Sequence, residues 1–296
     1  MSKTIKSIEK YRFNTFTDGN YDETIEITGE IMSHAEYDTQ ENLTISITYD
    51  THGNVAEHIV YAYNEQNKMI EELLFDEDEV VEKRQFEYNN EGLIAKEKIF
   101  YMDDSFDTML YTYDADNMLI EKKLINTDNE IESIHKFQFQ NKKIINEGDY
   151  DAENNLIYEK SYTYDEKGNL IKLSSYDAIE DETLEIFYEY DEKGNRIKIL
   201  NHDKTGKLAT RSTYKYNDAN QIIALVEDTT LLSTTYLLEY DETGKVKTQK
   251  EIGENEEAIA TTSYSYDGDM LIETTSEGEG YSHNYIIKSE IEYYNN

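Results

Sequence analysis

The chain has 296 residues and a formal net charge of -36, from 64 acidic and 28 basic residues. Nucleic acid and anionic membranes carry charge of the same sign, so this composition argues against both as direct ligands and favours a basic partner. The absence of cysteine excludes disulfides, thiolate metal sites and cysteine nucleophiles.

An aromatic-x-aromatic-Asp/Asn pattern recurs eleven times along the chain, with a spacing of 24 to 26 residues. A fixed period over the whole length indicates a repeat array rather than separate globular domains. We therefore predict a single array over residues 1–296, with a C-terminal cap at residues 282–296. The second aromatic residues of the pattern are Phe13, Tyr37, Tyr63, Tyr88, Tyr113, Phe139, Tyr164, Tyr190, Tyr216, Tyr240 and Tyr266.

Within a repeat, apolar and polar residues alternate with the period of a β-strand. In residues 155–164, Tyr162 and Tyr164 fall on one side of an extended chain, and Ser161 and Thr163 fall on the other. Helix is disfavoured because Tyr, Thr and Ile dominate these segments and the apolar spacing is two residues. We expect half-buried strands.

Two kinds of turn separate the strands. Residues 165–169, Asp-Glu-Lys-Gly-Asn, supply the short polar side chain and the left-handed position that a tight hairpin needs. Because a second turn lies halfway through each period, the array should contain about 22 strands in up-and-down antiparallel order. These less regular turns fall, in chain order, at residues 75–79, 101–107, 126–130, 150–154, 176–182 and 201–206.

A sheet of this width twists, so we expect it to coil into a curved or spiral sheet. Its row of Tyr and Leu side chains needs cover, either by inward curling or by another turn of the same ribbon. The 27 tyrosines are interpreted as a cross-strand ladder with buried rings and hydroxyl groups at the solvent edge. A platform for stacking carbohydrate is the alternative.

The sequence Tyr-x-Tyr-Asp-x-x-Gly-Asn-x-Ile at residues 162–171 and 188–197 resembles the YD repeat of RHS-type proteins. Weaker copies, such as those at residues 214–220 and 240–244, extend the resemblance over nearly the whole chain. The resemblance implies a spiralling ribbon of β-hairpins, which forms a hollow shell around a toxin in the large members. This chain is shorter than those shells and lacks a non-repetitive C-terminal segment. Small acidic proteins of this kind also occur beside polymorphic toxins as immunity proteins.

Residues with catalytic or metal-binding chemistry show no recognised pattern. The six histidines occupy different repeat positions, and only His52 and His58 are close in sequence, at a spacing without known ligand geometry, so we expect solvated histidines. Nucleophile-elbow, phosphate-loop and zinc-protease motifs are absent from the sequence. We predict no enzyme activity, no cofactor and no metal. Calcium at the Asp-rich turns 103–107 and 177–182 is an open alternative.

Acidic residues concentrate in the mid-period turns. Up-and-down order places these turns on one edge of the sheet, about 10 Å apart, which would form an acidic rim able to mimic nucleic acid toward a basic protein. A rim that only maintains solubility and prevents edge-to-edge aggregation is the alternative. The candidate partner-binding residues are Asp76, Glu77, Asp78, Glu79, Asp103, Asp104, Asp107, Asp177, Glu180, Asp181 and Glu182.

Three classes of function fit these observations. The first hypothesis is a cytoplasmic, non-enzymatic immunity protein that neutralises a basic toxin through its acidic surface. The expected cytoplasmic location follows from a polar start without a signal-peptide core and from the lack of any run near the roughly 18 apolar residues of a membrane span. The alternatives are a structural, secretion-associated RHS-like shell component and a surface glycan-binding repeat protein. The oligomeric state stays open.

Overall fold

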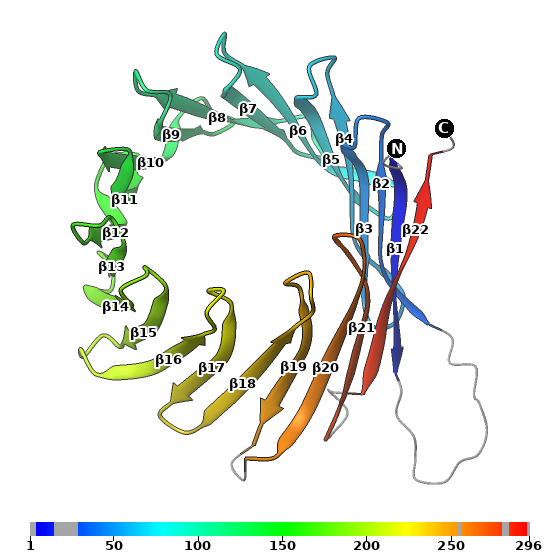
Figure 1. Cartoon of the computed structure of the whole chain (residues 1–296). Helices are drawn as coiled ribbons and strands as arrows, with labels where there is room; N and C mark the ends of the chain where they lie inside the picture. The colour runs from blue at the N-terminus through cyan, green and yellow to red at the C-terminus, as the bar shows by residue number, and fades with distance from the viewer. Residues whose placement is uncertain (1–3, 15–28, 254–255, 280–283, 295–296) are drawn as a thin grey trace. The chain divides into compact units, whose positions relative to one another are not determined.

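The computed structural model describes residues 4–14, 29–253, 256–279 and 284–294. In these residues the chain is all-β, as predicted, with 22 strands in one sheet. The strands, labelled as in Figure 1, are β1 (Ile5–Asn14), β2 (Glu30–Tyr37), β3 (Leu43–Tyr49), β4 (Val55–Tyr63), β5 (Met69–Asp76), β6 (Glu79–Tyr88), β7 (Ile94–Phe100), β8 (Phe106–Tyr113), β9 (Leu119–Ile125), β10 (Ile131–Gln140), β11 (Lys143–Asp151), β12 (Leu156–Tyr164), β13 (Leu170–Asp177), β14 (Glu182–Tyr190), β15 (Arg196–His202), β16 (Leu208–Tyr216), β17 (Ile222–Thr229), β18 (Ser233–Tyr240), β19 (Val246–Ile252), β20 (Ala258–Asp267), β21 (Met270–Gly278) and β22 (Tyr285–Tyr293).

The strands belong to two compact units. The first unit contains Met1–Phe86, Phe100–Asp104 and Leu238–Asn296. The second contains Glu87–Ile99 and Ser105–Leu237. The first unit therefore holds β1 to β5, most of β6 and β19 to β22, and the second holds β8 to β17 with most of β7 and β18.

In the first unit, β19 to β22 pair consecutively, β22 pairs with β1, and β1 to β6 continue the series. The β1–β22 register runs from Ile5↔Tyr293 to Asn14↔Tyr285, and Figure 1 shows the two strands side by side. Of the expected curved or spiral forms, the spiral is therefore wrong, because β22 pairs with β1. A spiral would leave β1 and β22 with unpaired backbone groups, whereas their pairing satisfies both edges.

In the second unit, β8 to β18 pair consecutively and antiparallel, in the predicted up-and-down order. Short connections of this kind join strands that are neighbours in the sheet. The segment 282–296, expected as a cap, contributes β22, which pairs with β21 on one side and β1 on the other.

The Tyr-Asp turns share one geometry. The Asp165 N–H donates to the Asn169 carbonyl, and the Gly168 N–H donates to the Asp165 carbonyl, both at 2.9 Å. Gly168 has a φ of 87°, the left-handed conformation that the sequence predicted. The Asp165 carboxylate accepts the backbone N–H of Asn169 at 2.7 Å and its side-chain amide at 2.9 Å. The result is a three-residue hairpin loop whose N–H groups are satisfied by aspartate.

This pair of backbone hydrogen bonds recurs in most Tyr-Asp turns and also closes five mid-period turns, which are more regular than expected. A two-residue loop replaces it after β10, where Asn141 and Lys142 both have positive φ. The other Tyr-Asp turns with the shared geometry begin at Asp38, Asn64, Asn89, Asp114, Asp191, Asn217 and Asp241, and the mid-period turns begin at Asp50, Asn126, Asp151, Asp203 and Gly253.

A β-bulge follows most of the Tyr-Asp hairpin loops. Between β12 and β13 the register changes from Thr163↔Lys172 to Tyr164↔Leu170, which leaves Ile171 without a cross-strand partner. Seven other described Tyr-Asp hairpins show the same shift. The last position of the repeated pattern therefore holds the extra residue of a bulge, which increases the local twist of the sheet.

The second tyrosine of the pattern ties adjacent strands together. Tyr190, at the end of β14, donates its hydroxyl to the Leu170 carbonyl at 2.8 Å. The β13–β14 ladder starts at Lys172↔Phe187, so this carbonyl lies beyond the ladder and accepts the hydroxyl instead. The hydroxyl groups of these tyrosines therefore bond to backbone carbonyls at strand ends. Equivalent bonds, at 2.7 to 3.0 Å, join Tyr63 to Leu43, Tyr113 to Ile94, Tyr164 to Ile144, Tyr216 to Arg196 and Tyr266 to Val246.

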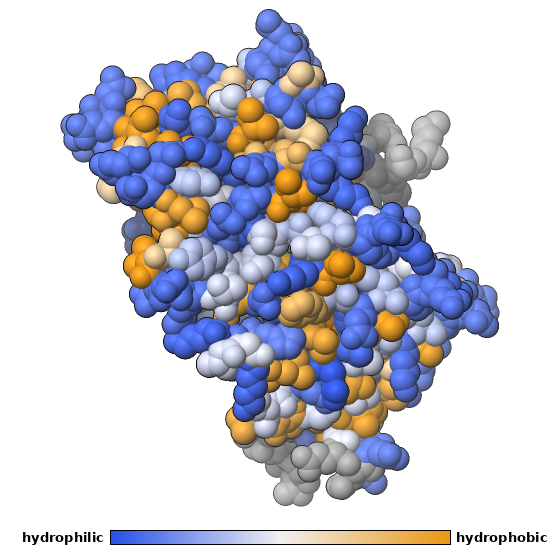
Figure 2. Space-filling view, turned by 90° about the vertical axis from the view of Figure 1, so that its left-hand side faces the viewer, coloured by the Kyte–Doolittle hydropathy of each residue, from blue (hydrophilic) through white to orange (hydrophobic). Residues whose placement is uncertain are grey.

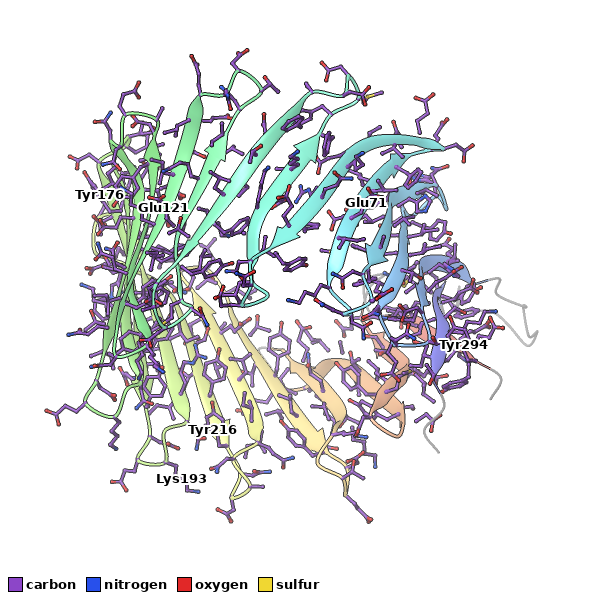
Figure 3. The ribbon with its side chains drawn as sticks, turned by 90° about the horizontal axis from the view of Figure 1, so that it is seen from above. Glu71, Glu121, Tyr176, Lys193, Tyr216 and Tyr294 are labelled. Carbon is purple, nitrogen blue, oxygen red and sulfur yellow. The ribbon has the colours of Figure 1, made fainter. Side chains whose placement is uncertain are left out.

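Figure 3 labels two of the tyrosines that make such bonds, Tyr216 and Tyr294. Tyr294 follows β22 and donates to the Tyr37 carbonyl at the end of β2, at 2.6 Å. This bond spans β1, because β1 lies between β22 and β2 in the sheet. A tyrosine hydroxyl thus reinforces the pairing that closes the strand order.

The apolar side chains have little complete cover. Among the described residues, only Ile134, Ala224 and Ala260 are buried apolar side chains, and most strand residues are half-buried. On the face that Figure 2 shows, hydrophilic and hydrophobic residues are intermingled. The tyrosine and leucine rows are covered mainly by their cross-strand neighbours, so side-chain pairs rather than a thick core supply the packing energy.

Replacing Tyr190 by phenylalanine tests the tyrosine hydrogen bond. The change leaves the Leu170 carbonyl without its donor, so we expect the free energy of unfolding to fall by about 1 kcal/mol. Urea unfolding measures the difference. Tyr214→Phe is the matched control, because its hydroxyl makes no hydrogen bond to the described residues. Equal losses in the two variants would show that the bond contributes nothing.

Gly194→Ala tests the left-handed turn position. Gly194 has a φ of 87° and an added Cβ would meet no atom within 4 Å, so any cost arises from the backbone. We expect a loss of about 1 kcal/mol in thermal unfolding. Gly194→Asn should cost less, because asparagine takes the same position at Asn117 and Asn220 with φ of 62° and 60°. An asparagine variant less stable than the alanine variant would contradict this account.

Candidate functional site

Six of the predicted acidic residues lie on two exposed turns of the first unit. Residues 76–79 connect β5 to β6 through a two-residue loop, in which Glu77 has a φ of 52°. Asp103 and Asp104 follow β7, and the Asp104 N–H donates to the Tyr101 carbonyl at 3.0 Å. All six side chains belong to exposed residues, as the sequence predicted.

Asp104 of the second turn and residues 80–83, which follow the first turn, line a depression of about 400 Å³. Met102 is 70% exposed and Val80 is 41% exposed, so apolar surface is available there. The Lys83 ammonium lies 4.5 Å from the centre of the Phe100 ring, a cation-π distance. The depression is lined by Glu71, Leu73, Val80, Val81, Glu82, Lys83, Phe100, Tyr101, Met102 and Asp104.

The predicted acidic residues of the second unit take part in local structure. Asp177 accepts the N–H groups of Ile179 and Glu180 at 2.9 and 3.0 Å, which closes the turn between β13 and β14. Glu182 forms an ion pair with Lys204. These acidic residues therefore shape their own hairpin.

Asp107 departs from the prediction of an exposed rim. It is only 9% exposed, because it is the second residue of β8 rather than part of the preceding turn. Asp181 is exposed and accepts the Tyr176 hydroxyl at 3.0 Å, which raises the pKa of Tyr176. The acidic residues expected on one continuous rim thus divide into exposed turns in the first unit, an internally bonded hairpin in the second, and one buried residue.

A cross-strand row of polar side chains in the second unit was not apparent from the sequence. Tyr111, Lys122, His135 and Asp149 are successive register partners on β8 to β11, so their side chains share one face of the sheet. Lys122 lies 5.8 Å from the Tyr111 ring centre, and His135 is hydrogen-bonded to Asp149. The row continues over β12 to β14 through Tyr158, Asp177 and Glu182.

Glu147 is the hub of the polar contacts beside this row. It accepts the Tyr162 hydroxyl at 2.8 Å and the Lys160 ammonium at 3.1 Å, and its carboxylate lies 3.8 Å from Nε2 of His135. Burial favours the neutral carboxyl, but the hydrogen bonds from Tyr162 and Lys160 outweigh it and hold the pKa of Glu147 below its usual range. The Glu147 contact raises the pKa of Lys160, and burial together with Glu147 raises the pKa of Tyr162.

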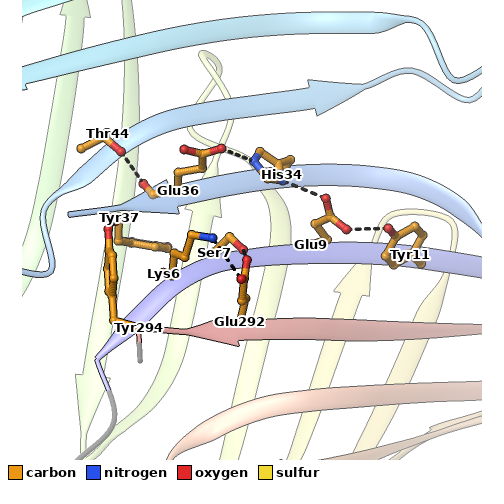
Figure 4. Close-up of polar contacts among 10 residues, drawn as sticks. All are labelled: Lys6, Ser7, Glu9, Tyr11, His34, Glu36, Tyr37, Thr44, Glu292 and Tyr294. Carbon is orange, nitrogen blue, oxygen red and sulfur yellow. Dashed lines mark hydrogen bonds and ion pairs between the residues drawn. The ribbon is translucent and has the colours of Figure 1, made fainter. Parts of the chain in front are cut away.

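A second polar cluster lies where β1 pairs with β22 and β2 (Figure 4). The Lys6 ammonium contacts the Glu292 carboxylate at 3.0 Å, so an ion pair joins the two strands. His34 lies between two carboxylates, with Nδ1 at 3.0 Å from Glu9 and Nε2 at 3.1 Å from Glu36. A neutral imidazole ring can donate to only one of these partners.

The same cluster lines a polar depression of about 380 Å³. The Tyr11 hydroxyl donates to Glu9 at 2.6 Å. This bond, with that from His34, holds the pKa of Glu9 below its usual range, and it raises the pKa of Tyr11 to about 12. Lys6 and Glu292 are 286 positions apart in the sequence. Only the pairing of β1 and β22 brings them together.

The histidines do not share one environment. His52 is exposed, as predicted, whereas His34 and His135 lie between carboxylates and were wrongly expected to be solvated. His58 stacks on Phe75 with ring centres 4.8 Å apart, and His202 packs edge-on against Phe187. The last histidine, at position 283, lies outside the described residues. Within the described ranges, no group of three or more His, Cys, Asp or Glu side chains is arranged to hold a metal ion.

The comparisons with known proteins give distant structural similarity only. No protein-family profile matches this chain, and no curated protein sequence matches it. It is similar to the crystal structures of TcdB2-TccC3-Cdc42 and of TcdB2-TccC3 without its hypervariable C-terminal region, with 14% and 15% identity and TM-scores of 0.37 and 0.36. Both alignments cover 94% of this chain but only 14% of the other.

A porin-like protein from Bacteroides uniformis is similar at 11% identity and a TM-score of 0.33, with 98% of both chains covered. Similarity at this level defines no family. Over the part of the chain that the structure describes, no helix has the length and apolar character needed to cross a membrane.

Glu147 makes the stability of the second unit depend on pH. Its pKa is lowered by folding, so the ionised carboxylate stabilises the fold above the ordinary pKa of glutamate, and this contribution is lost as the pH falls through the folded pKa. We expect Glu147→Gln to reduce stability at neutral pH and to flatten the decline between about pH 5 and pH 3 in urea unfolding. Glu189→Gln, which removes an exposed ion pair to Lys198 at 2.7 Å, is the control. Identical pH profiles for wild type and Glu147→Gln would refute the assignment.

Proposed function

We propose that this chain is a cytoplasmic, non-enzymatic binding protein of the YD/RHS-repeat type, and that it acts as an immunity protein that neutralises a basic toxin. The observation that carries the proposal is the exposure of the carboxylates at residues 76–79 and of Asp103 and Asp104, close to a depression with both apolar and charged walls. The chain as a whole has a formal net charge of -36. A field of this sign attracts a basic protein and orients it before contact.

The distribution of ion pairs supports binding at the turns rather than on the polar row. Glu147 is occupied by Lys160 and Tyr162, and Asp149 is occupied by His135. Displacing these partners would cost the hydrogen bonds that hold neighbouring strands together. The carboxylates at residues 76–79 and at Asp103 and Asp104 belong to exposed residues at turns, so these turns are the favoured contact surface.

The shifted titratable groups support a structural rather than a catalytic role for the row. The carboxylate Glu147 has a lowered pKa, and Tyr162 and Lys160 have raised pKa values, so each group is stabilised in the protonation state that it ordinarily has at neutral pH. A general acid or base would instead need a pKa moved toward the working pH.

Capture of the protein from its source cell tests the proposal. We expect a basic protein to be recovered in a stoichiometric complex and identified by mass spectrometry, with the complex in the cytosolic fraction. The affinity should fall steeply as salt is raised from about 50 to 200 mM, because exposed charges are screened. Recovery of no basic partner, or an affinity that does not change with salt concentration, would count against the proposal.

A charge-neutralised turn locates the binding surface on that partner. The variant changes residues 76–79 to their amides, and we expect the affinity to fall by about tenfold and the salt dependence to weaken. The matched control removes four exposed carboxylates from Tyr-Asp turns, so net charge falls equally. Equal losses of affinity in both variants would show that only overall charge matters. The control changes are Glu166→Gln, Glu192→Gln, Asp218→Asn and Glu242→Gln.

A further inference from the structure

The depression between the β5–β6 turn and residues 100–104 combines apolar walls with an acidic border. We propose that it is the docking site for a basic protein segment that carries one large apolar or aromatic side chain flanked by Lys or Arg. This inference rests on the proposed function and specifies the chemistry of the partner. All residues that line the depression belong to the first unit.

Part of the surface of this depression is apolar and exposed. Met102 is 70% exposed, and Val80 and Tyr101 are each 41% exposed. Together with Leu73 and Phe100 they form the apolar walls of the depression. Its volume, about 400 Å³, lies near the lower end of the roughly 300–1,000 Å³ of pockets that hold small ligands, which is sufficient for one large side chain.

The charge around these walls is mainly negative. From Glu71 to Glu82 the chain has seven carboxylates, and Asp103 and Asp104 add two more. Two of the seven, Glu72 and Glu82, lie 3.7 and 2.7 Å from Nε of Arg84. Lys83 is the basic residue in the lining, and its ammonium is placed over the Phe100 ring. An apolar anchor would gain burial in the depression while flanking cations meet the carboxylates, the arrangement of a binding hot spot with a charged border.

The β13–β14 hairpin of the second unit provides a close internal comparison. Ile179 is 74% exposed and stands among acidic residues, so its chemistry and exposure resemble those of Met102. Its neighbour Asp177 is engaged in the turn, and Asp181 accepts the Tyr176 hydroxyl. A substitution at Ile179 therefore controls for the general effect of removing an exposed apolar side chain beside acidic residues.

Two labelled peptides test the proposal on the full-length protein by fluorescence anisotropy. One has the sequence Lys-Lys-Lys-Leu-Trp-Lys-Lys-Lys, and the other replaces Leu-Trp by Gly-Gly. We expect the Leu-Trp peptide to bind about tenfold more tightly, because both carry the same charge and only one has an anchor. Met102→Gln should remove this advantage and leave the Gly-Gly peptide unaffected. Glu77→Gln combined with Asp78→Asn should weaken both peptides.

The control variant and a second wall variant decide the outcome. Ile179→Gln should leave both affinities unchanged, and Val80→Thr should reduce the advantage of the Leu-Trp peptide as Met102→Gln does. Retention of the advantage in both wall variants, or its loss in Ile179→Gln, overturns the docking site. Equal binding of the two peptides to the wild-type protein overturns it as well.

The proposed function is judged separately, by capture of a basic partner from the cell. If that partner loses affinity when residues 76–79 are neutralised but keeps it in Met102→Gln, the acidic binding function stands and the apolar docking site falls. Loss of partner affinity in both variants, with Ile179→Gln unaffected, supports the docking site.

Discussion

The Asp-centred hairpin turn is the constraint on which the rest of the sheet depends. A carboxylate such as that of Asp165 accepts loop N–H groups, and the residue three positions later takes a left-handed conformation. The chain thus reverses after three residues and enters the next strand with a bulge at Ile171. The bulge and turn together leave the Leu170 carbonyl outside the ladder, where the Tyr190 hydroxyl reaches it. The turn, the bulge and the tyrosine hydrogen bond therefore form one recurring structural motif.

The pairing of β1 with β22 has energetic consequences because the described residues contain few buried apolar side chains. A sheet of this kind is held by backbone ladders and by cross-strand side-chain pairs, each contributing about 0.2–1 kcal/mol. An unpaired edge would lose part of that sum and would offer a template for association with other chains. The ion pair between Lys6 and Glu292 and the bond from Tyr294 to Tyr37 strengthen the pairing at the junction.

The acidic residues serve two physical purposes. Within the sheet, carboxylates such as Glu147 and Glu9 accept hydrogen bonds from tyrosine, histidine or lysine on the same or neighbouring strands, which compensates for their partial burial. On the turns at residues 76–79 and at Asp103 and Asp104, carboxylates face solvent beside apolar surface. The first group stabilises the sheet, and the second provides the field and the border that the proposed basic partner would meet.

Local chemistry in the sequence determined the strand number, the antiparallel order and the turn positions. A two-residue apolar period and an Asp-x-x-Gly turn act over a few residues, so they can be recognised without knowing what lies nearby. The same reasoning correctly predicted that residues 76–79 are exposed. It wrongly predicted that Asp107 is exposed, because β8 begins one residue before it.

Only the tertiary structure decided that β1 meets β22, that Lys122, His135 and Asp149 share one row, and that Met102 lies beside Val80. Each of these depends on which strands become neighbours and on the register left after every bulge. A shift of one residue moves a side chain to the opposite face, and small shifts of twist accumulate from strand to strand. The spacing of the sequence repeat does not contain this information. The pairing of the terminal strands and the side-chain rows are therefore determined only in the folded sheet.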